Sequence, residues 1–184
     1  KIPLNLEMAP TKEMLDIAIK LNLTRICLVP EKRKEITTEG GLDLKKDDKK
    51  LRIFINKLLK KKIKVSLFVN PDISQIKKAK NLHVSAIELN TGLFCDKKEN
   101  KYLEYKKIRS AALFAKKNNL ECHAGHGITY KTVGIISKIN EISELNIGHF
   151  IIGESIFLGL KESILRMRKL MDNSRKKIIL DKSA

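Results

Sequence analysis

Hydrophobic positions along this chain alternate between two periods. Short, mostly apolar runs, typical of buried strands, cover residues 4–8, 25–29, 63–69, 86–91, 120–124 and 144–149. In all but one of the gaps between these runs, apolar residues recur at helical spacing, most clearly over 47–60 and 101–117, and they do so again over 155–172, after the last run. Asp72 followed by Gln75 predicts a capping box at the start of the helix after the third run. The pattern therefore predicts a repeated strand–helix unit.

Six such units predict a parallel sheet covered by helices, because parallel strands need a crossover of about a dozen residues. The chain contains neither a Gly-x-Gly-x-x-Gly turn nor a Walker lysine loop, which disfavours a nucleotide-binding sheet. A (β/α)8 TIM barrel fits better, although such a barrel has eight strands and typically about 250 residues. We therefore expect an α/β fold in which residues 1–184 form a single barrel domain, supplying about the last six βα units, with about two units preceding residue 1.

The formal net charge of +17 raises the question of a nucleic-acid partner. We expect none, because lysines outnumber arginines 31 to 7 and aromatic residues make up only 5% of the chain. The lysines also fall on the polar faces of the predicted helices. A solvated helix surface is therefore the favoured interpretation, and a nucleic-acid-binding module remains a competing one.

Membrane insertion and secretion are also disfavoured. No run approaches the ~20 apolar residues that span a bilayer, and the chain does not open on a secretory signal. The three cysteines, Cys27, Cys95 and Cys122, are odd in number and widely spaced, which argues against a disulfide framework. We expect a cytoplasmic protein with no membrane partner.

Four titratable residues lie at or just past the C-terminal ends of predicted strands, where barrel active sites are built: Glu7, Glu88, His126 and His149. Glu7 and Glu88 interrupt apolar strands, and burial there would raise a carboxyl pKa and create a proton acceptor. A structural ion pair with a lysine or arginine of a neighbouring strand explains the same residues equally well. His126, which lies between two glycines, suits a general acid or a phosphate ligand, with a hydrogen-bonded loop histidine as the alternative.

Glycines beside histidines also predict anion sites. In 122–127 and again in 146–149 a strand ends in glycine next to histidine, and a helix begins soon afterwards, at about 153–155 in the second case. The loop 37–41 combines two threonines with two glycines and predicts an oxyanion cradle, or alternatively helix-capping threonines. Cys122, His123 and His126 do not share one face of a strand, so we expect no metal site.

Seven segments, in order along the chain, resemble the pyridoxine 5′-phosphate synthase family. They are Asn-Leu-Glu-Met-Ala at 5–9, Leu-Val-Pro-Glu-Lys-Arg at 28–33, Thr-Thr-Glu-Gly-Gly-Leu-Asp at 37–43, Val-Ser-Leu-Phe at 65–68, Ile-Glu-Leu-Asn-Thr-Gly at 87–92, Ala-Gly-His-Gly at 124–127 and Glu-Leu-Asn-Ile-Gly-His at 144–149. Each motif alone is weak, whereas the ordered set is specific.

The resemblance implies a (β/α)8 barrel assembled as a homo-octamer. It implies a transferase of vitamin B6 biosynthesis that condenses 1-deoxy-D-xylulose 5-phosphate with 3-amino-2-oxopropyl phosphate, releases phosphate and water, and uses no metal or organic cofactor. By motif, Glu7 would be a proton acceptor, His126 the proton donor and Glu88 a stabiliser of charged intermediates. The substrate-binding residues implied in the same way are Thr37 for the deoxyxylulose phosphate, and Gly127, Gly148 and His149 for the aminoketone phosphate.

The chain departs from this family at two positions, since Asn90 stands where histidine is usual and His123 where asparagine is usual. The family's first two βα units, with an Asn-x-Asp-His segment, a further catalytic histidine and substrate-binding arginines, have no match here. Another phosphosugar aldolase or isomerase barrel remains an alternative. It would be favoured by a Schiff-base lysine, but the predicted strand ends named above carry no lysine.

Overall fold

Six parallel strands form one sheet in the computed structural model, which describes residues 3–30, 40–44, 49–96 and 100–181. The strands pair in chain order: β1 (Asn5–Met8), β2 (Arg25–Leu28), β3 (Lys64–Val69), β4 (Ala86–Asn90), β5 (Glu121–Gly125) and β6 (Glu144–Asn146). All six predicted runs are confirmed as strands. The last strand is shorter than expected, because it ends at Asn146 rather than at His149.

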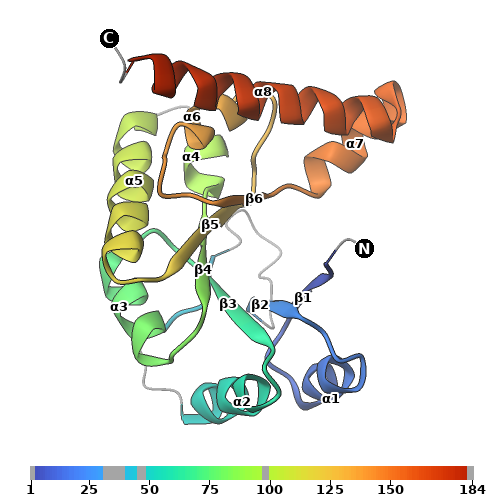
Figure 1. The fold of residues 1–184 in the computed structure, drawn as a ribbon, viewed down its shortest axis with the longest axis vertical. Helices are drawn as coiled ribbons and strands as arrows, with labels where there is room; N and C mark the ends of the chain where they lie inside the picture. The colour runs from blue at the N-terminus through green and yellow to red at the C-terminus, as the bar shows by residue number, and fades with distance from the viewer. Residues whose placement is uncertain (1–2, 31–39, 45–48, 97–99, 182–184) are drawn as a thin grey trace.

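The described helices alternate with these strands. They are α1 (Lys12–Lys20), α2 (Lys49–Lys60), α3 (Ile73–Asn81), α4 (Gly92–Asp96), α5 (Lys101–Lys117), α6 (Val133–Ser137), α7 (His149–Leu158) and α8 (Leu160–Asp181). In Figure 1, α1, α2, α3 and α5 lie along the outer side of a curved sheet, and α8 crosses the end near β6. None of the helices that the structure describes is both long and apolar enough to cross a membrane.

Two local predictions are wrong. The single helix expected over 155–172 is two helices, because Gly159 adopts φ +79 and ends α7. The capping box is only half formed. The Asp72 carboxylate accepts a hydrogen bond of 2.8 Å from the backbone N–H of Ser74. The side-chain oxygen of Gln75, however, accepts one of 2.7 Å from the backbone N–H of Leu44. A buried glutamine therefore anchors the segment before α2 rather than capping its own helix.

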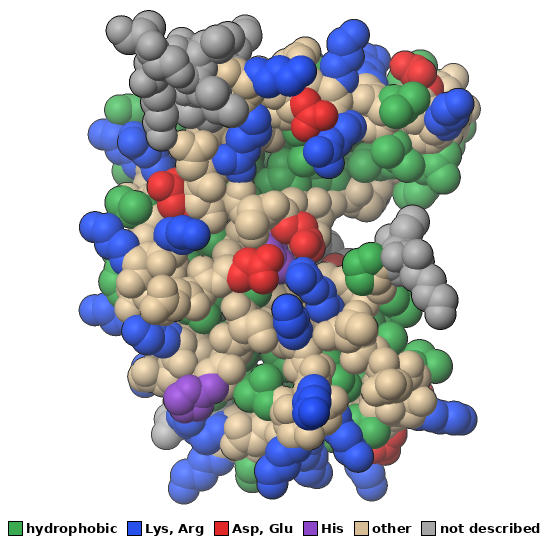
Figure 2. All heavy atoms as spheres, viewed as in Figure 1, with side chains coloured by type: hydrophobic (Ala, Val, Ile, Leu, Met, Phe, Trp, Pro, Cys, Tyr) green, Lys and Arg blue, Asp and Glu red, His purple; other side chains and the backbone are tan. Residues whose placement is uncertain are grey.

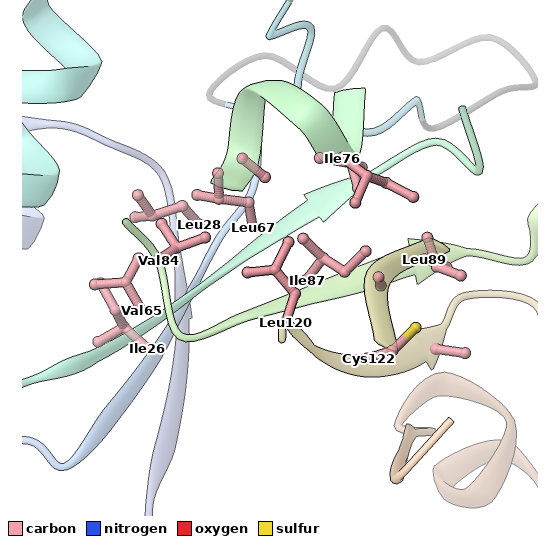
Figure 3. Close-up of a cluster of buried hydrophobic side chains, with 14 of the residues drawn as sticks. Ile26, Leu28, Val65, Leu67, Ile76, Val84, Ile87, Leu89, Leu120 and Cys122 are labelled. Atoms are coloured by element: carbon pink, nitrogen blue, oxygen red, sulfur yellow. The ribbon is translucent and has the colours of Figure 1, made fainter. Parts of the chain in front are cut away.

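The two faces of the sheet differ in chemistry. On the outer face, alternate strand residues pack against the helices in one apolar core, drawn in Figure 3. This core includes Ile26, Leu28, Val65, Leu67, Ile87, Leu89 and Cys122. The other strand positions face inward and are mainly polar. This alternation puts Glu7, Cys27 and Glu88 on the inner face, away from the apolar core.

The sheet curls enough for strands far apart in its order to meet across the inner face. Arg25 on β2 lies 3.4 Å from a carboxylate oxygen of Glu144 on β6, although three strands separate them in the sheet. A flat sheet would hold these strands about 19 Å apart, at about 4.8 Å per step. The six strands therefore form an arc of a barrel.

The inward contacts also follow a regular stagger. Through the strand pairing, Cys27 on β2 is level with Ala86 on β4, whereas its thiol reaches Glu88, two residues further along. Glu88 is level with Glu144 on β6, whereas it accepts a hydrogen bond from Asn146, again two residues further. The side chains that meet inside the arc thus advance by one residue per strand.

Candidate active site at the carboxyl ends of the strands

Glu88 is the most buried carboxylate on the inner face, at 6% exposure. Its Oε2 atom accepts a hydrogen bond of 2.6 Å from the Asn146 amide and one of 3.4 Å from the Cys27 thiol. Burial raises the pKa of the Glu88 carboxyl, while these two donors oppose the rise because they stabilise the ionised form. Of the two interpretations left open, the structure favours a buried carboxyl held by neutral donors over an ion pair.

Cys27 completes this contact from β2. Burial raises the pKa of its thiol, and the neighbouring Glu88 carboxylate raises it further. The thiol therefore stays protonated at neutral pH and acts as a hydrogen-bond donor rather than as a nucleophile.

Gly125 leaves the space that the other Glu88 oxygen occupies. A Cβ atom at Gly125 would lie 2.1 Å from Glu88 Oε1, far inside van der Waals contact. Gly125 pairs with Asn90, two residues beyond Glu88, so Oε1 lies on the side of the strands' carboxyl ends. The glycine is required here by close approach and not by an unusual backbone conformation.

His126 follows β5 directly and adopts φ +75, a left-handed conformation that is strained for a residue other than glycine. Two contacts with the residues directly after β4 hold it. The Thr91 hydroxyl lies 2.6 Å from the His126 carbonyl oxygen and 2.9 Å from that of Gly125. The histidine ring lies against Gly92, where a Cβ would come within 2.6 Å of ring atom Cδ2. The ring is thus positioned at the exit of β5, as predicted.

Asn90, at one of the two departures from the family pattern, lies beside this ring. Its Nδ2 donates to Asn70 Oδ1 at 3.2 Å, and its Oδ1 accepts from the backbone N–H of Gly92 at 2.9 Å. Asn70 Oδ1 also accepts from the backbone N–H of Gly41 at 3.1 Å. The amides of Asn70 and Asn90 therefore connect the exits of three neighbouring strands.

His123, the second departure, points inward nearer the start of the strands. Its Nε2 lies 3.2 Å from Glu121 and its Nδ1 3.8 Å from Glu144, although neither contact has hydrogen-bond geometry. Cys122 points to the opposite face, into the apolar core. The side chains of Cys122 and His123 therefore lie on opposite faces of the sheet and do not form a common site.

Glu7 differs from expectation. It lies on the inner face of β1, one residue before the strand ends, but its side chain is exposed rather than buried. The burial that we expected for this carboxylate is therefore not found. Glu7 and Glu88 both occupy inner-face strand positions, and the charge of Glu7 contributes to raising the pKa of Glu88. Thr37 lies outside the described residues.

The glycines expected to bind phosphate occupy two strand exits. Gly127 adopts φ +73 beside His126. Gly148 is the N-cap of α7, and His149 is the first residue of that helix, which therefore begins earlier than the predicted 153–155. Among the residues that the structure describes, nothing lies within 4 Å of the place a Gly148 Cβ would take. The exits of β5 and β6, neighbours in the sheet, thus present glycine backbone beside histidine.

Sequence reasoning missed the residues that hold the candidate ones, namely Cys27, Thr91, Asn90 and Asn146. The available signal was strand parity. Cys27 pairs directly with Glu7, and Asn146 lies two residues after Glu144, so alternation would have put Cys27, Asn90 and Asn146 on the inner face. Thr91 lies just past β4 with the opposite parity, and alternation gives no signal for it.

Comparison with known proteins identifies close relatives. Residues 1–173 match the family model described as "Pyridoxal phosphate biosynthesis protein PdxJ". The chain is 53% identical over 175 residues to pyridoxine 5'-phosphate synthase of Zymomonas mobilis, covering 95% of this chain and 68% of that protein. It is 50% identical over 173 residues to the protein of the same name from Pelagibacter ubique, covering 92% of this chain and 72% of that protein.

Similarity to solved structures concerns the fold alone. A structure of the Amycolatopsis orientalis BexX/CysO complex superposes with a TM-score of 0.60 at 12% identity, covering 88% of this chain and 59% of that one. Citrate synthase SbnG gives a TM-score of 0.54 at 10% identity, covering 92% and 73%.

Proposed function

This chain belongs to the PdxJ family of pyridoxal phosphate biosynthesis proteins, and we propose that the exits of β4, β5 and β6 hold its pyridoxine 5′-phosphate synthase site. The enzyme condenses 1-deoxy-D-xylulose 5-phosphate with 3-amino-2-oxopropyl phosphate and closes the pyridine ring, releasing phosphate and water. The observation that carries the placement is that Glu88, whose carboxylate is fixed by hydrogen bonds, lies against Gly125, the residue directly before His126 at the exit of β5.

The reaction moves protons repeatedly, because amine condensation, phosphate elimination and ring closure each need a donor or an acceptor. We assign His126 as the proton donor, supported by its fixed position at the exit of β5. Glu88 stabilises cationic intermediates, supported by its burial, which strengthens its field. Glu7 is the proton acceptor, and its exposed side chain on the inner face leaves it accessible to a substrate.

The second phosphate site is assigned to Gly127, Gly148 and His149. Its support is the start of the ten-residue helix α7 at His149, since unpaired backbone N–H groups and the helix dipole favour an anion at such a terminus. The open space at Gly148 is a further support. Thr37 is assigned to the deoxyxylulose phosphate on the resemblance alone.

Replacing Gly148 with valine is expected to raise the KM for the aminoketone phosphate by about tenfold or more, which corresponds to one lost phosphate contact. The melting temperature should change little, because nothing in the described structure lies within 4 Å of the new Cβ. Steady-state kinetics and thermal melting of the same preparation measure both quantities.

Gly153→Val is the matched control, because Gly153 lies in the same helix and also has open space around it. It should leave KM unchanged. Equal effects of the two substitutions on KM would remove the start of α7 from the phosphate site.

A complete (β/α)8 barrel, with two further βα units before residue 1, is also a proposal. Its support is the stagger of one residue per strand, because eight strands with that stagger have a total shear of about eight, the value of TIM barrels. The chain also spans 68–72% of the length of the relatives named above. The missing catalytic histidine and arginines of the resemblance would then lie in those units.

Assembly and location are proposed on separate grounds. A homo-octamer is supported by exposed apolar side chains on α7, where Ile156 is 80% and Phe157 85% exposed, and Figure 2 shows hydrophobic side chains gathered along α7 and α8. Light scattering measures the assembly directly. A cytoplasmic location is supported by the three free cysteines. Basic side chains spread around the face in Figure 2 rather than forming one patch, which supports a protein without a nucleic-acid partner.

A further inference from the structure

The carboxylate of Glu88, on β4, is held by donors from β2 and β6, the next alternate strands on its two sides. Asn146 on β6 and Cys27 on β2 both donate to Oε2, while Oε1 fills the space that Gly125 leaves open on the side of the strand ends. In barrels, side chains from alternate strands fill the interior in layers, and these three residues form such a layer. The layer directs Oε1 of Glu88 toward the carboxyl ends of the strands, where the proposed reaction takes place.

We propose that Asn146 and Cys27 are positioning residues, which hold Glu88 in a single orientation and keep it ionised so that it can stabilise cationic intermediates. This inference rests on the proposed function for the chemistry that Glu88 serves. The hydrogen bonds themselves stand on the geometry alone.

The electrostatic balance at Glu88 explains why two donors are needed. Burial removes water from the Glu88 carboxylate, which raises its pKa. The negative charge of Glu7 disfavours a second negative charge on Glu88 and raises that pKa further. The Asn146 amide and the Cys27 thiol lower it, as does the charge of His123 when that ring is protonated. Cys27 remains a donor because its own thiol pKa is raised. Without the two donors, Glu88 would take up a proton at higher pH.

Asn146→Leu keeps the approximate volume and removes the donor. It should move the acid limb of the kcat against pH profile upward by about one pH unit, the usual strength of a hydrogen bond to a charged group. At the original optimum kcat should fall about tenfold, and part of the loss should be recovered at higher pH. KM for both substrates should change less than kcat, because the residue acts through Glu88.

Cys27→Ala should shift the acid limb in the same direction by a smaller amount, because a thiol is a weak donor. Cys27→Ser restores a hydroxyl donor and should return the profile toward that of the parent. Cys122→Ala is the matched control: it removes another buried strand cysteine, which points into the apolar core on the other face. It should leave the pH profile unchanged.

The infrared C=O band of protonated Glu88, assigned with Glu88→Gln, gives a readout that needs no turnover. Its titration midpoint should rise in Asn146→Leu and in Cys27→Ala. An unchanged midpoint in both variants, or an equal shift in Cys122→Ala, would overturn the inference. If Asn146→Leu does not fold, the comparison of Cys27→Ala with Cys27→Ser decides it. A parent protein that makes no product would reject the proposed function, while the titration would still test the layer.

Discussion

Replacing His126 with alanine is expected to lower kcat by about 10²- to 10⁴-fold while leaving the fold intact, because the imidazole is the assigned proton donor. The side chain is only half-buried, and its ring stands 6.3 Å from the Phe68 ring centroid, so little packing is lost. Single-turnover kinetics with both substrates and a thermal melt measure the two effects separately.

His83→Ala is the matched control. His83 is another histidine with positive φ, +56 against +75 for His126, but it lies in the turn before β4. The variant His83→Ala measures the loss of stability that alanine causes in a left-handed conformation, and its kcat should remain at the parent value. His126→Asn adds a residue that tolerates this conformation and cannot donate a catalytic proton. Activity above roughly half of the parent in either His126 variant would remove the ring from the mechanism.

Replacing Gly125 with alanine is expected to reduce kcat by about 10²- to 10³-fold, comparable to the loss of one preorganised electrostatic contact in an active site. The new methyl group would lie 2.1 Å from Glu88 Oε1, so the carboxylate must move. The forced shift in a packed interior should also cost about 1–3 kcal/mol of unfolding free energy. Kinetics and denaturant unfolding measure the two changes.

A double-mutant cycle with Glu88→Ala shows whether the collision is the cause. With the carboxylate removed, Gly125→Ala should destabilise the protein less than it does in the parent. Gly153→Ala, at a position where nothing in the described structure lies within 4 Å of the new Cβ, controls for the replacement of a glycine in itself. Additive effects of the Gly125 and Glu88 substitutions would show that the two residues are not in contact.

The strands were predictable from sequence because each is a short apolar run, and the predicted boundaries agree closely up to β5. The last helical region was not. The apolar residues from His149 to Met171 continue at helical spacing across Gly159, and only the left-handed backbone there divides α7 from α8. Periodicity reports which residues are apolar, and not where a glycine turns the chain.

The candidate site was likewise predictable only in part. Glu88 and His126 were predictable because a carboxylate inside an apolar strand and a histidine between glycines are locally unusual. Asn146 and Cys27 were not, because each becomes important only where the curled sheet brings β2, β4 and β6 together, 58 and 61 residues from Glu88 in sequence. The exposure of the Glu7 side chain was not predictable from sequence either, because this exposure depends on what covers the edge strand β1.

The most direct test of the proposed function is an assay of the intact protein with 1-deoxy-D-xylulose 5-phosphate and 3-amino-2-oxopropyl phosphate. The amounts of pyridoxine 5′-phosphate and of inorganic phosphate are measured in the same reaction. Both products should appear in equal amounts, and His126→Ala and Gly125→Ala should suppress both while each variant remains folded. A folded parent protein that forms no pyridoxine 5′-phosphate, or variants that form it at the parent rate, would contradict the assignment of this site.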